Sequence, residues 1–301
     1  MTHRLSAAGV AMALAGAFSY GFNISFASLS AQFGVSGPVL VSYRMITMLA
    51  LAAAALAILR TRFFVPQSER GGVILIGLTS VGVGVGYLSA VAYIPVTVAA
   101  VIFYTFPILI VVATPFIDRR PLTPAMIFVT LLAFAGVVLV VGPALDALDW
   151  RGIALAFVAS LSAAIQFFAG TRCKTTPLAS KILAAQCVAL PFTIIIAMVA
   201  GGMKPPSILL NAPIAVGITI VGFMFGFLFQ MLALNRIPAS AAGLAFCAEP
   251  VVAALSSAVI LGERLGPVQY AGGALVIAAI VLNVVFENRR ADAIATVMPE
   301  G

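Results

Sequence analysis

The sequence LAFCAEPVVAALSSAVILGERL, Leu244 to Leu265, is apolar over nearly its whole length, yet it contains one carboxylate, Glu249, directly followed by Pro250. An apolar run of about 20 residues is long enough to cross a bilayer as a helix. Glu249 lies ten residues after Ala239 and twelve before Leu261, which puts it near the middle of such a helix. An ionisable group at this depth costs about 2.5–3.5 kcal/mol on insertion scales, so Glu249 is predicted to be a functional residue.

Similar apolar segments recur along the whole chain. Of its 301 residues, 63% are hydrophobic and only 8% are Asp, Glu, Lys or Arg, whereas a soluble domain carries about 25% charged residues. A membrane β-barrel would show alternating segments of about ten residues, and these are absent from the sequence. The composition therefore predicts an all-α polytopic membrane protein. Its ten expected transmembrane helices cover residues 7–29, 37–59, 71–93, 96–117, 123–142, 152–170, 180–200, 211–234, 239–261 and 267–286.

The basic residues between these segments predict the topology. With the N-terminus placed inside, the inner side holds Arg4, Arg60, Arg62, Arg70, Arg119, Arg120, Arg172, Lys174, Lys181, Arg236, Arg289 and Arg290, and the outer side holds Arg151, Lys204 and Arg264. Cytoplasmic loops carry the excess of Lys and Arg, so both termini are expected in the cytoplasm. Because these charges lie in short loops, the net charge of +7 indicates topology and no nucleic-acid partner.

An internal repeat runs through the chain at a constant offset of 143 residues. It relates Pro95 to Pro238, Pro107 to Pro250 and Pro124 to Pro267. We expect a first five-helix repeat over residues 1–147, a second over 148–290 and a cytoplasmic tail over 291–301. Since five is an odd number, the second repeat must be inverted in the membrane relative to the first. Inverted repeats are typical of transporters, in which two related halves alternate around a site near the midplane.

The residue inventory argues against an enzyme. The only histidine is His3, and the three cysteines, Cys173, Cys187 and Cys247, have no metal or disulfide spacing. Zinc chemistry and Ser-His or Cys-His catalysis therefore lack their components, and no cofactor is expected.

Two motifs carry a resemblance to a known family. Ala248 to Ala254, AEPVVAA, followed by Leu261 to Leu265, LGERL, resembles the second repeat of the EamA-type drug/metabolite transporter superfamily. Gly152 to Gln166 resembles the opening helix of a repeat, and Arg44 matches an arginine often found in the second helix. Residues 118–122, DRRPL, depart from the family pattern in the first repeat.

This resemblance implies ten helices around a central cavity lined mainly by helices 1–4 and 6–9. It also implies transport of small metabolites, commonly amino-acid export, across a bacterial inner membrane. Length and composition resemble the aromatic and neutral amino-acid exporters of the superfamily.

Glu249 and Arg44 are the charged candidates for the site. Glu249 could bind a proton or a substrate amino group, or it could stabilise the helix bend at Pro250. Arg44 could bind a substrate carboxylate, or its side chain could extend to the outer headgroups. If both face the cavity, they offer one charge to each end of a zwitterion.

The repeat also pairs polar side chains at matching depths, which suggests an aqueous cavity or, alternatively, hydrogen bonds between helices. These candidates are Asn23, Gln166, Tyr87, Gln230, Tyr43 and Gln186. Four aromatic residues could form the walls of the cavity or could simply pack between helices: Tyr20, Phe103, Tyr104 and Phe246. Moving gates are expected in the helices that begin at Pro95 and Pro238 and are interrupted at Pro107 and Pro250.

The sequence thus predicts a secondary transporter or facilitator that exports amino acids by alternating access. The alternatives are an exporter of cationic drugs or polyamines, and a membrane scaffold or sensor without transport. The expected partners are a small-molecule substrate, the lipid bilayer and a candidate proton, while the oligomeric state stays open.

Overall fold

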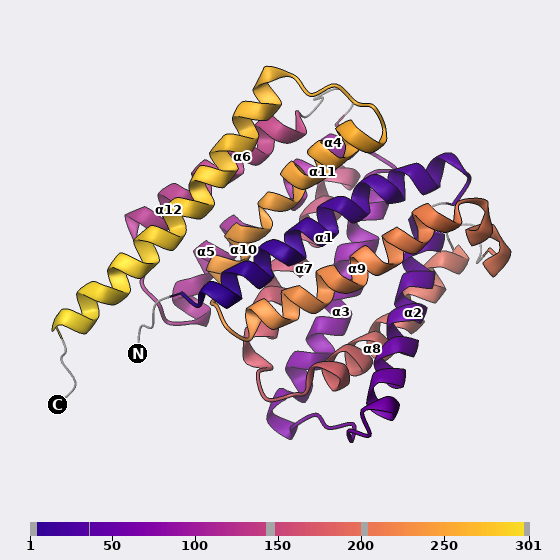
Figure 1. Ribbon diagram of the computed structural model, residues 1–301, viewed down its shortest axis with the longest axis horizontal. Coiled ribbons are helices and arrows are strands. Elements are labelled where there is room, and N and C mark those ends of the chain that lie inside the picture. The colour runs from indigo at the N-terminus through magenta and orange to yellow at the C-terminus, as the bar shows by residue number, and fades with distance from the viewer. Residues whose placement is uncertain (1–4, 36, 143–147, 200–203, 298–301) are drawn as a thin grey trace.

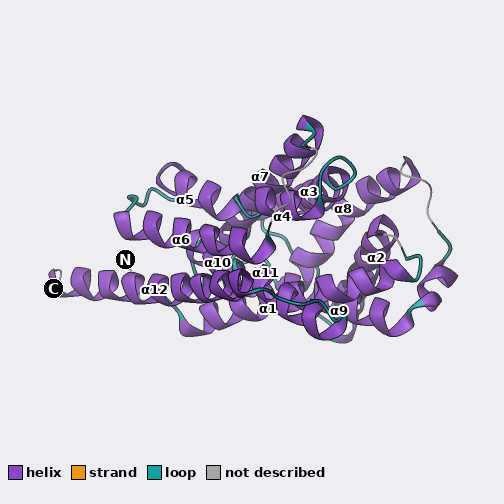
Figure 2. Ribbon diagram, turned by 90° about the horizontal axis from the view of Figure 1, so that it is seen from above, coloured by secondary structure: helices purple, strands orange, loops and turns teal. Residues whose placement is uncertain are grey.

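The computed structural model describes residues 5–35, 37–142, 148–199 and 204–297, and all regular secondary structure in these ranges is helical (Figures 1 and 2). Ten helical segments in the described ranges are long and apolar enough to cross a membrane, which confirms the predicted fold class. The helices are α1 (Ala7–Gln32), α2 (Gly37–Ile58), η1 (Gln67–Glu69), α3 (Arg70–Ala90), α4 (Val96–Phe103), α5 (Phe106–Ile117), α6 (Pro124–Val141), α7 (Trp150–Arg172), α8 (Leu178–Val199), η2 (Pro206–Asn211), α9 (Pro213–Leu234), α10 (Ala239–Phe246), α11 (Ala248–Ile260) and α12 (Pro267–Val297).

The last helix is longer than expected. Sequence hydropathy predicts its end at residue 286, but α12 continues to Val297 and projects beyond the other helices (Figure 2). The apolar, membrane-spanning part ends at Arg290. Residues 291–297, which the sequence analysis assigns to a separate tail, are therefore helical and continuous with α12.

Two of the ten spans are broken near their middle. The fourth consists of α4 and α5, interrupted at Tyr104 and Thr105, and the ninth consists of α10 and α11, interrupted at Cys247. Positions 104 and 247 are related by the 143-residue offset of the repeat. The break precedes each proline by about one turn, so Pro107 and Pro250 lie in the first turn of the next helix. A proline is tolerated there because its missing N–H would have no helical acceptor.

Helices from the two halves of the chain lie side by side in exchanged pairs. α1 packs along α9 and α3 along α7, while α2 packs on α8 and α6 on α12 (Figure 1). The offset of 143 residues relates α1 to α7 and α3 to α9, so the α1–α9 pair is equivalent to the α3–α7 pair. It also relates α2 to α8 and α6 to α12, so in each of these two pairs the partners are equivalent helices of the two repeats. The packing follows the same 143-residue offset as the sequence, while the division into two inverted repeats stays a prediction.

Glycines permit the closest of these helix contacts. A Cβ atom added at Gly136 would lie 2.7 Å from the Gly272 carbonyl oxygen, so α6 and α12 touch through their backbones. Large apolar side chains such as Phe116 and Val259, 83% and 86% exposed, cover the outside of the bundle. Such a surface is suited to lipid contact, because lipid chains are as apolar as these side chains.

Candidate functional site

Glu249 lies in the first turn of α11, directly after the break at Cys247. Tyrosines from three other parts of the chain face it: Tyr20 on α1, Tyr87 on α3 and Tyr104 at the end of α4. The Tyr104 hydroxyl is the hydrogen-bond donor to the Glu249 carboxylate. The carboxylate therefore points toward the interior of the bundle, although its side chain is only partly buried.

The backbone of Glu249 is held against α1. A Cβ atom at Gly21 would lie 2.5 Å from the Glu249 carbonyl oxygen, so only glycine fits at this crossing. One turn further along α1, the Ser25 hydroxyl lies 2.6 Å from the Ser256 hydroxyl and 2.9 Å from the Ser257 hydroxyl. α1 thereby fixes the position of α11 and, with it, the direction of the Glu249 side chain.

Arg44 on α2 also points inward. Its guanidinium carbon lies 3.8 Å from the centre of the Phe223 ring on α9, a cation–π contact. Its Nε atom is buried and makes no hydrogen bond with the described residues. Tyr20 is within electrostatic range of both Arg44 and Glu249, so the two opposite charges lie near the same tyrosine.

A chain of hydrogen bonds crosses four helices next to Tyr20. The Tyr20 hydroxyl donates to Gln230 Oε1 at 3.1 Å, and Gln230 Nε2 donates to Gln166 Oε1 at 3.1 Å. Gln166 Nε2 donates to the Ser80 hydroxyl at 2.9 Å, which donates to the Ile76 carbonyl at 2.8 Å. The structure thus brings Gln166 and Gln230 together, in buried positions. Because Tyr20 uses its proton for Gln230, its oxygen can only accept further hydrogen bonds.

Three of the polar candidates lie elsewhere. The Tyr43 hydroxyl donates to the Lys204 carbonyl at 2.6 Å, in the segment after α8. Gln186 is buried between α8 and α2, with Nε2 3.8 Å from Met48 Sδ. Asn23 is buried where α1 meets α9, and its Oδ1 has no hydrogen-bond partner among the described residues.

Aromatic rings form a continuous layer beside Glu249. The Phe103 ring lies 5.7 Å from Tyr87 and 5.2 Å from Tyr104, and the Phe246 ring lies 6.0 Å from Tyr20. Phe167, absent from the sequence-based candidates, joins the two groups, since it lies 5.3 Å from both Phe106 and Phe246. Phe106, which replaces the acid in the first repeat, is therefore part of this layer.

Hydrogen bonds close the bundle at the end that holds both chain termini. Glu69 accepts hydrogen bonds from the backbone N–H groups of Thr175 and Thr176, at 3.0 and 2.8 Å. Lys181 is completely buried and donates to Asn235 Oδ1 at 3.1 Å. These contacts join the start of α3 to the α7–α8 turn, and α8 to the end of α9.

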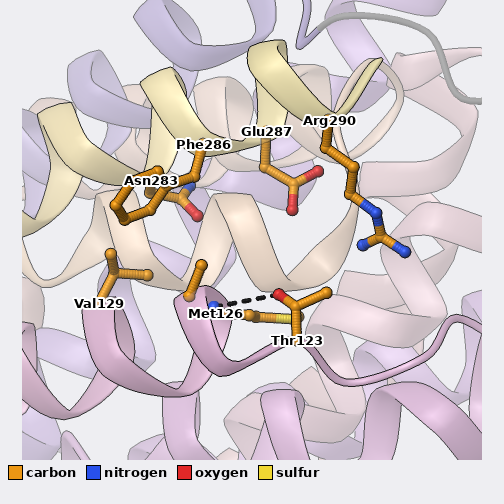
Figure 3. A pocket seen from close by; sticks show the side chains of 8 residues that line it. Thr123, Met126, Val129, Asn283, Phe286, Glu287 and Arg290 are labelled. Atoms are coloured by element: carbon orange, nitrogen blue, oxygen red, sulfur yellow. Dashed lines mark hydrogen bonds between the residues drawn. The ribbon is translucent and has the colours of Figure 1, made fainter. Parts of the chain in front are cut away.

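Pockets lie on two sides of the bundle in the described ranges. One of about 340 Å³ lies between α2, α3 and α8 and includes Ser42, Gly84 and Thr193. The other, of about 300 Å³, lies between α6 and α12 (Figure 3). Glu249 and Arg44 line neither of them, so the central cavity stays a prediction. Within the described residues, no three His, Cys, Asp or Glu side chains form a metal-ligand cluster.

A fold with ten membrane-spanning helical segments in the described residues defines the class as a polytopic helical membrane protein. The chain belongs to the EamA-like transporter family, whose model matches residues 7–142 and 150–285. This confirms the resemblance seen in the sequence, and the two matched segments are again 143 residues apart.

Similar proteins include amino-acid exporters. The threonine/homoserine exporter RhtA of Escherichia coli K12 is 26% identical over 243 residues, covering 78% of this chain and 79% of the exporter. The exporter of the same name from Salmonella typhimurium LT2 is 25% identical over 242 residues, with the same coverage. A protein of known crystal structure aligns with a TM-score of 0.75 over 95% of this chain and 99% of its own, at 20% identity, which supports the fold alone.

Proposed function

We propose that this protein exports small neutral amino acids, of the size of threonine or homoserine, across a bacterial inner membrane by alternating access. The observation that carries the proposal is that Glu249 and Arg44 both lie within electrostatic range of the same residue, Tyr20. The similarity to threonine/homoserine exporters supports the substrate class.

The side chains around Tyr20 suit the two ends of a zwitterion. Glu249 and the acceptor-only oxygen of Tyr20 match an ammonium group, which has hydrogens to donate and no lone pair. The Arg44 guanidinium matches a carboxylate, and its unpartnered Nε leaves at least one donor for it. The aromatic layer of Phe103, Phe246 and their neighbours is suited to the substrate side chain.

Alternating access is supported by the difference between the two ends of the bundle. Almost all of α10 is buried, whereas α11 is partly accessible along nearly its whole length. Together with the hydrogen bonds of Glu69 and Lys181, this supports our assignment of a state closed at the end where α1 begins. In our proposal that end faces the cytoplasm, and the breaks near Pro107 and Pro250, with the helix starts at Pro95 and Pro238, are the hinges of the moving gates.

The sequence contains no motif for ATP binding. In our proposal the free energy for transport therefore comes from the substrate gradient or from an ion gradient. Glu249 is the side chain that we assign to proton exchange, since it is a carboxylate near mid-span that faces the interior and accepts a hydrogen bond from Tyr104. The same residue would then contact the proton and the substrate amine in turn.

Export of organic cations is a second candidate function. Tyr20, Tyr87 and Tyr104 around one carboxylate form an aromatic environment of the kind that binds ammonium ions by cation–π contacts. In that case Arg44, held on Phe223, would repel the substrate and contribute nothing to its binding.

Arg44→Gln separates these two functions in proteoliposomes that contain the full chain. For an amino-acid substrate, losing the carboxylate partner costs about 2–5 kcal/mol, so we expect the apparent affinity for threonine in counterflow to fall by about 30-fold or more. Arg120→Gln, which removes an exposed arginine, is the matched control and should leave counterflow unchanged. Unaltered threonine counterflow in the Arg44 variant would contradict the amino-acid assignment, and tetraphenylphosphonium transport by both variants would favour the cation exporter.

A further inference from the structure

Neither Glu249 nor Arg44 lines the pocket between α6 and α12, so this pocket is separate from the proposed transport site. Its lining comes from one face of each helix: Thr123, Ala125, Met126 and Val129 on α6, and Asn283, Phe286, Glu287 and Arg290 on α12. It occupies about 300 Å³ at the end of α12 near the C-terminus (Figures 1 and 3).

Helix geometry explains why a pocket opens here. At Gly136 and Gly272 the backbones of α6 and α12 are in direct contact, and Gln269 Nε2 donates to the Val140 carbonyl at 3.2 Å. Toward Met126 and Asn283 the facing residues are larger than glycine, and the pocket lies between their side chains.

The polar side chains that α12 contributes to this pocket have no hydrogen-bond or ion-pair partner among the described residues, while the Thr123 hydroxyl accepts a hydrogen bond from the Met126 N–H at 3.2 Å. Asn283 is nine-tenths buried, yet its amide makes no hydrogen bond to any described residue, and Glu287 and Arg290 form no ion pair with one. Asn283, Glu287 and Arg290 are spaced i, i+4 and i+7, so they share one face of α12. Figure 3 shows all three side chains directed from α12 toward the start of α6.

A ligand for this pocket must therefore offer both charges and an apolar part. Arg290 and the Thr123 hydroxyl match a phosphate, while the Glu287 carboxylate and the Asn283 amide oxygen match an ammonium group. Met126, Val129 and Phe286 provide apolar contact on helices that span the membrane. A diacyl phospholipid has this combination of groups, and its headgroup lies at the depth where these spans end.

We propose that the groove is a binding site for a phospholipid with a primary ammonium headgroup, such as phosphatidylethanolamine. An anionic lipid without an amine would leave Glu287 facing negative charge. Phosphatidylcholine carries no N–H donor for Glu287 or Asn283. Bound in this way, the lipid contacts residues of both α6 and α12.

Native mass spectrometry of the purified full chain tests this site. We titrate phosphatidylethanolamine, phosphatidylcholine and phosphatidylglycerol with identical acyl chains. Because charged hydrogen bonds contribute about 1.5–3 kcal/mol, we expect phosphatidylethanolamine to bind about tenfold more tightly than the other two. Equal binding of the three lipids, or preference for phosphatidylglycerol, overturns the proposal.

Variants identify the site within the chain. Glu287→Gln and, independently, Asn283→Leu should reduce the preference for phosphatidylethanolamine over phosphatidylcholine, and Arg290→Gln should weaken binding of both lipids. Arg289→Gln removes the same charge from an exposed neighbour on α12 and should change neither. If Arg289→Gln has the same effect as Arg290→Gln, or if the preference survives all three site variants, the lipid binds elsewhere. The lipid preference of the unmodified chain tests the proposal even where a variant fails to fold.

Discussion

Glu249→Gln is expected to abolish the pH dependence of transport while leaving substrate counterflow measurable. Glutamine keeps the shape of the side chain and can still accept the hydrogen bond from Tyr104, but it cannot bind or release a proton. Counterflow exchanges substrate for substrate and needs no net proton movement. The variant should therefore retain exchange and lose accumulation driven by a proton gradient.

Proteoliposomes with an imposed pH gradient measure this effect. A gradient of one pH unit supplies about 1.4 kcal/mol per proton, enough for about tenfold accumulation. We expect the unmodified chain to approach this ratio with threonine and the Glu249→Gln chain to show none. Accumulation by the variant equal to that of the unmodified chain would remove Glu249 from the coupling mechanism.

Gly21→Ala is expected to destabilise the fold and to displace Glu249, although it adds only one methyl group. The new Cβ atom would lie 2.5 Å from the Glu249 carbonyl oxygen and 2.8 Å from Val252 Cβ. The first of these is a backbone atom, so α1 and α11 must separate, and such overpacking costs about 1–3 kcal/mol. Transport should fall as well, because the displacement moves Glu249.

Thermal unfolding in detergent, with Gly84→Ala as the control, measures this cost. Gly84 also lies inside a helix, but an added Cβ atom would meet only Val41 Cγ1, at 4.0 Å. Helix propensity favours alanine over glycine by up to about 1 kcal/mol. We therefore expect a lower melting temperature for the first variant and an equal or higher one for the second. Equal melting temperatures and equal transport would show that α1 and α11 are not held together as described.

The sequence predicted the fold in most of its detail, because the length and apolarity of each span depend only on the bilayer. The offset of 143 residues anticipated the two helix breaks, since both follow from prolines that the repeat relates. The breaks lie about one turn before Pro107 and Pro250, the residues at which the sequence predicts them. The reason is that a proline is tolerated in the first turn of a helix, so α5 and α11 begin just before their prolines. The length of α12 was underestimated, because hydropathy detects only its apolar part.

The arrangement of side chains was harder to predict. In a membrane both the lipid and the protein interior are apolar, so no polar face indicates how each helix is rotated. Tyr43 and Arg44 are neighbours in sequence, yet the first contacts the Lys204 carbonyl and the second contacts Phe223. Gln186 and Tyr43 were expected to line the same cavity because the repeat places them at equal depth in the membrane. Depth alone does not determine the direction in which a side chain points. Ser80 and Phe223 were missed for the same reason, since serine and phenylalanine are ordinary packing residues in helices.

Substrate protection of Glu249 is the most direct test of the central claim, that this carboxylate faces the transported solute. The purified chain is treated with a hydrophobic carbodiimide, with and without threonine, and modification of the peptide containing Glu249 is quantified by mass spectrometry, with Glu249→Gln as the blank. We predict modification in the absence of substrate and protection over the same threonine concentrations that saturate counterflow. Modification that is independent of threonine, in a preparation that transports it, would contradict the claim.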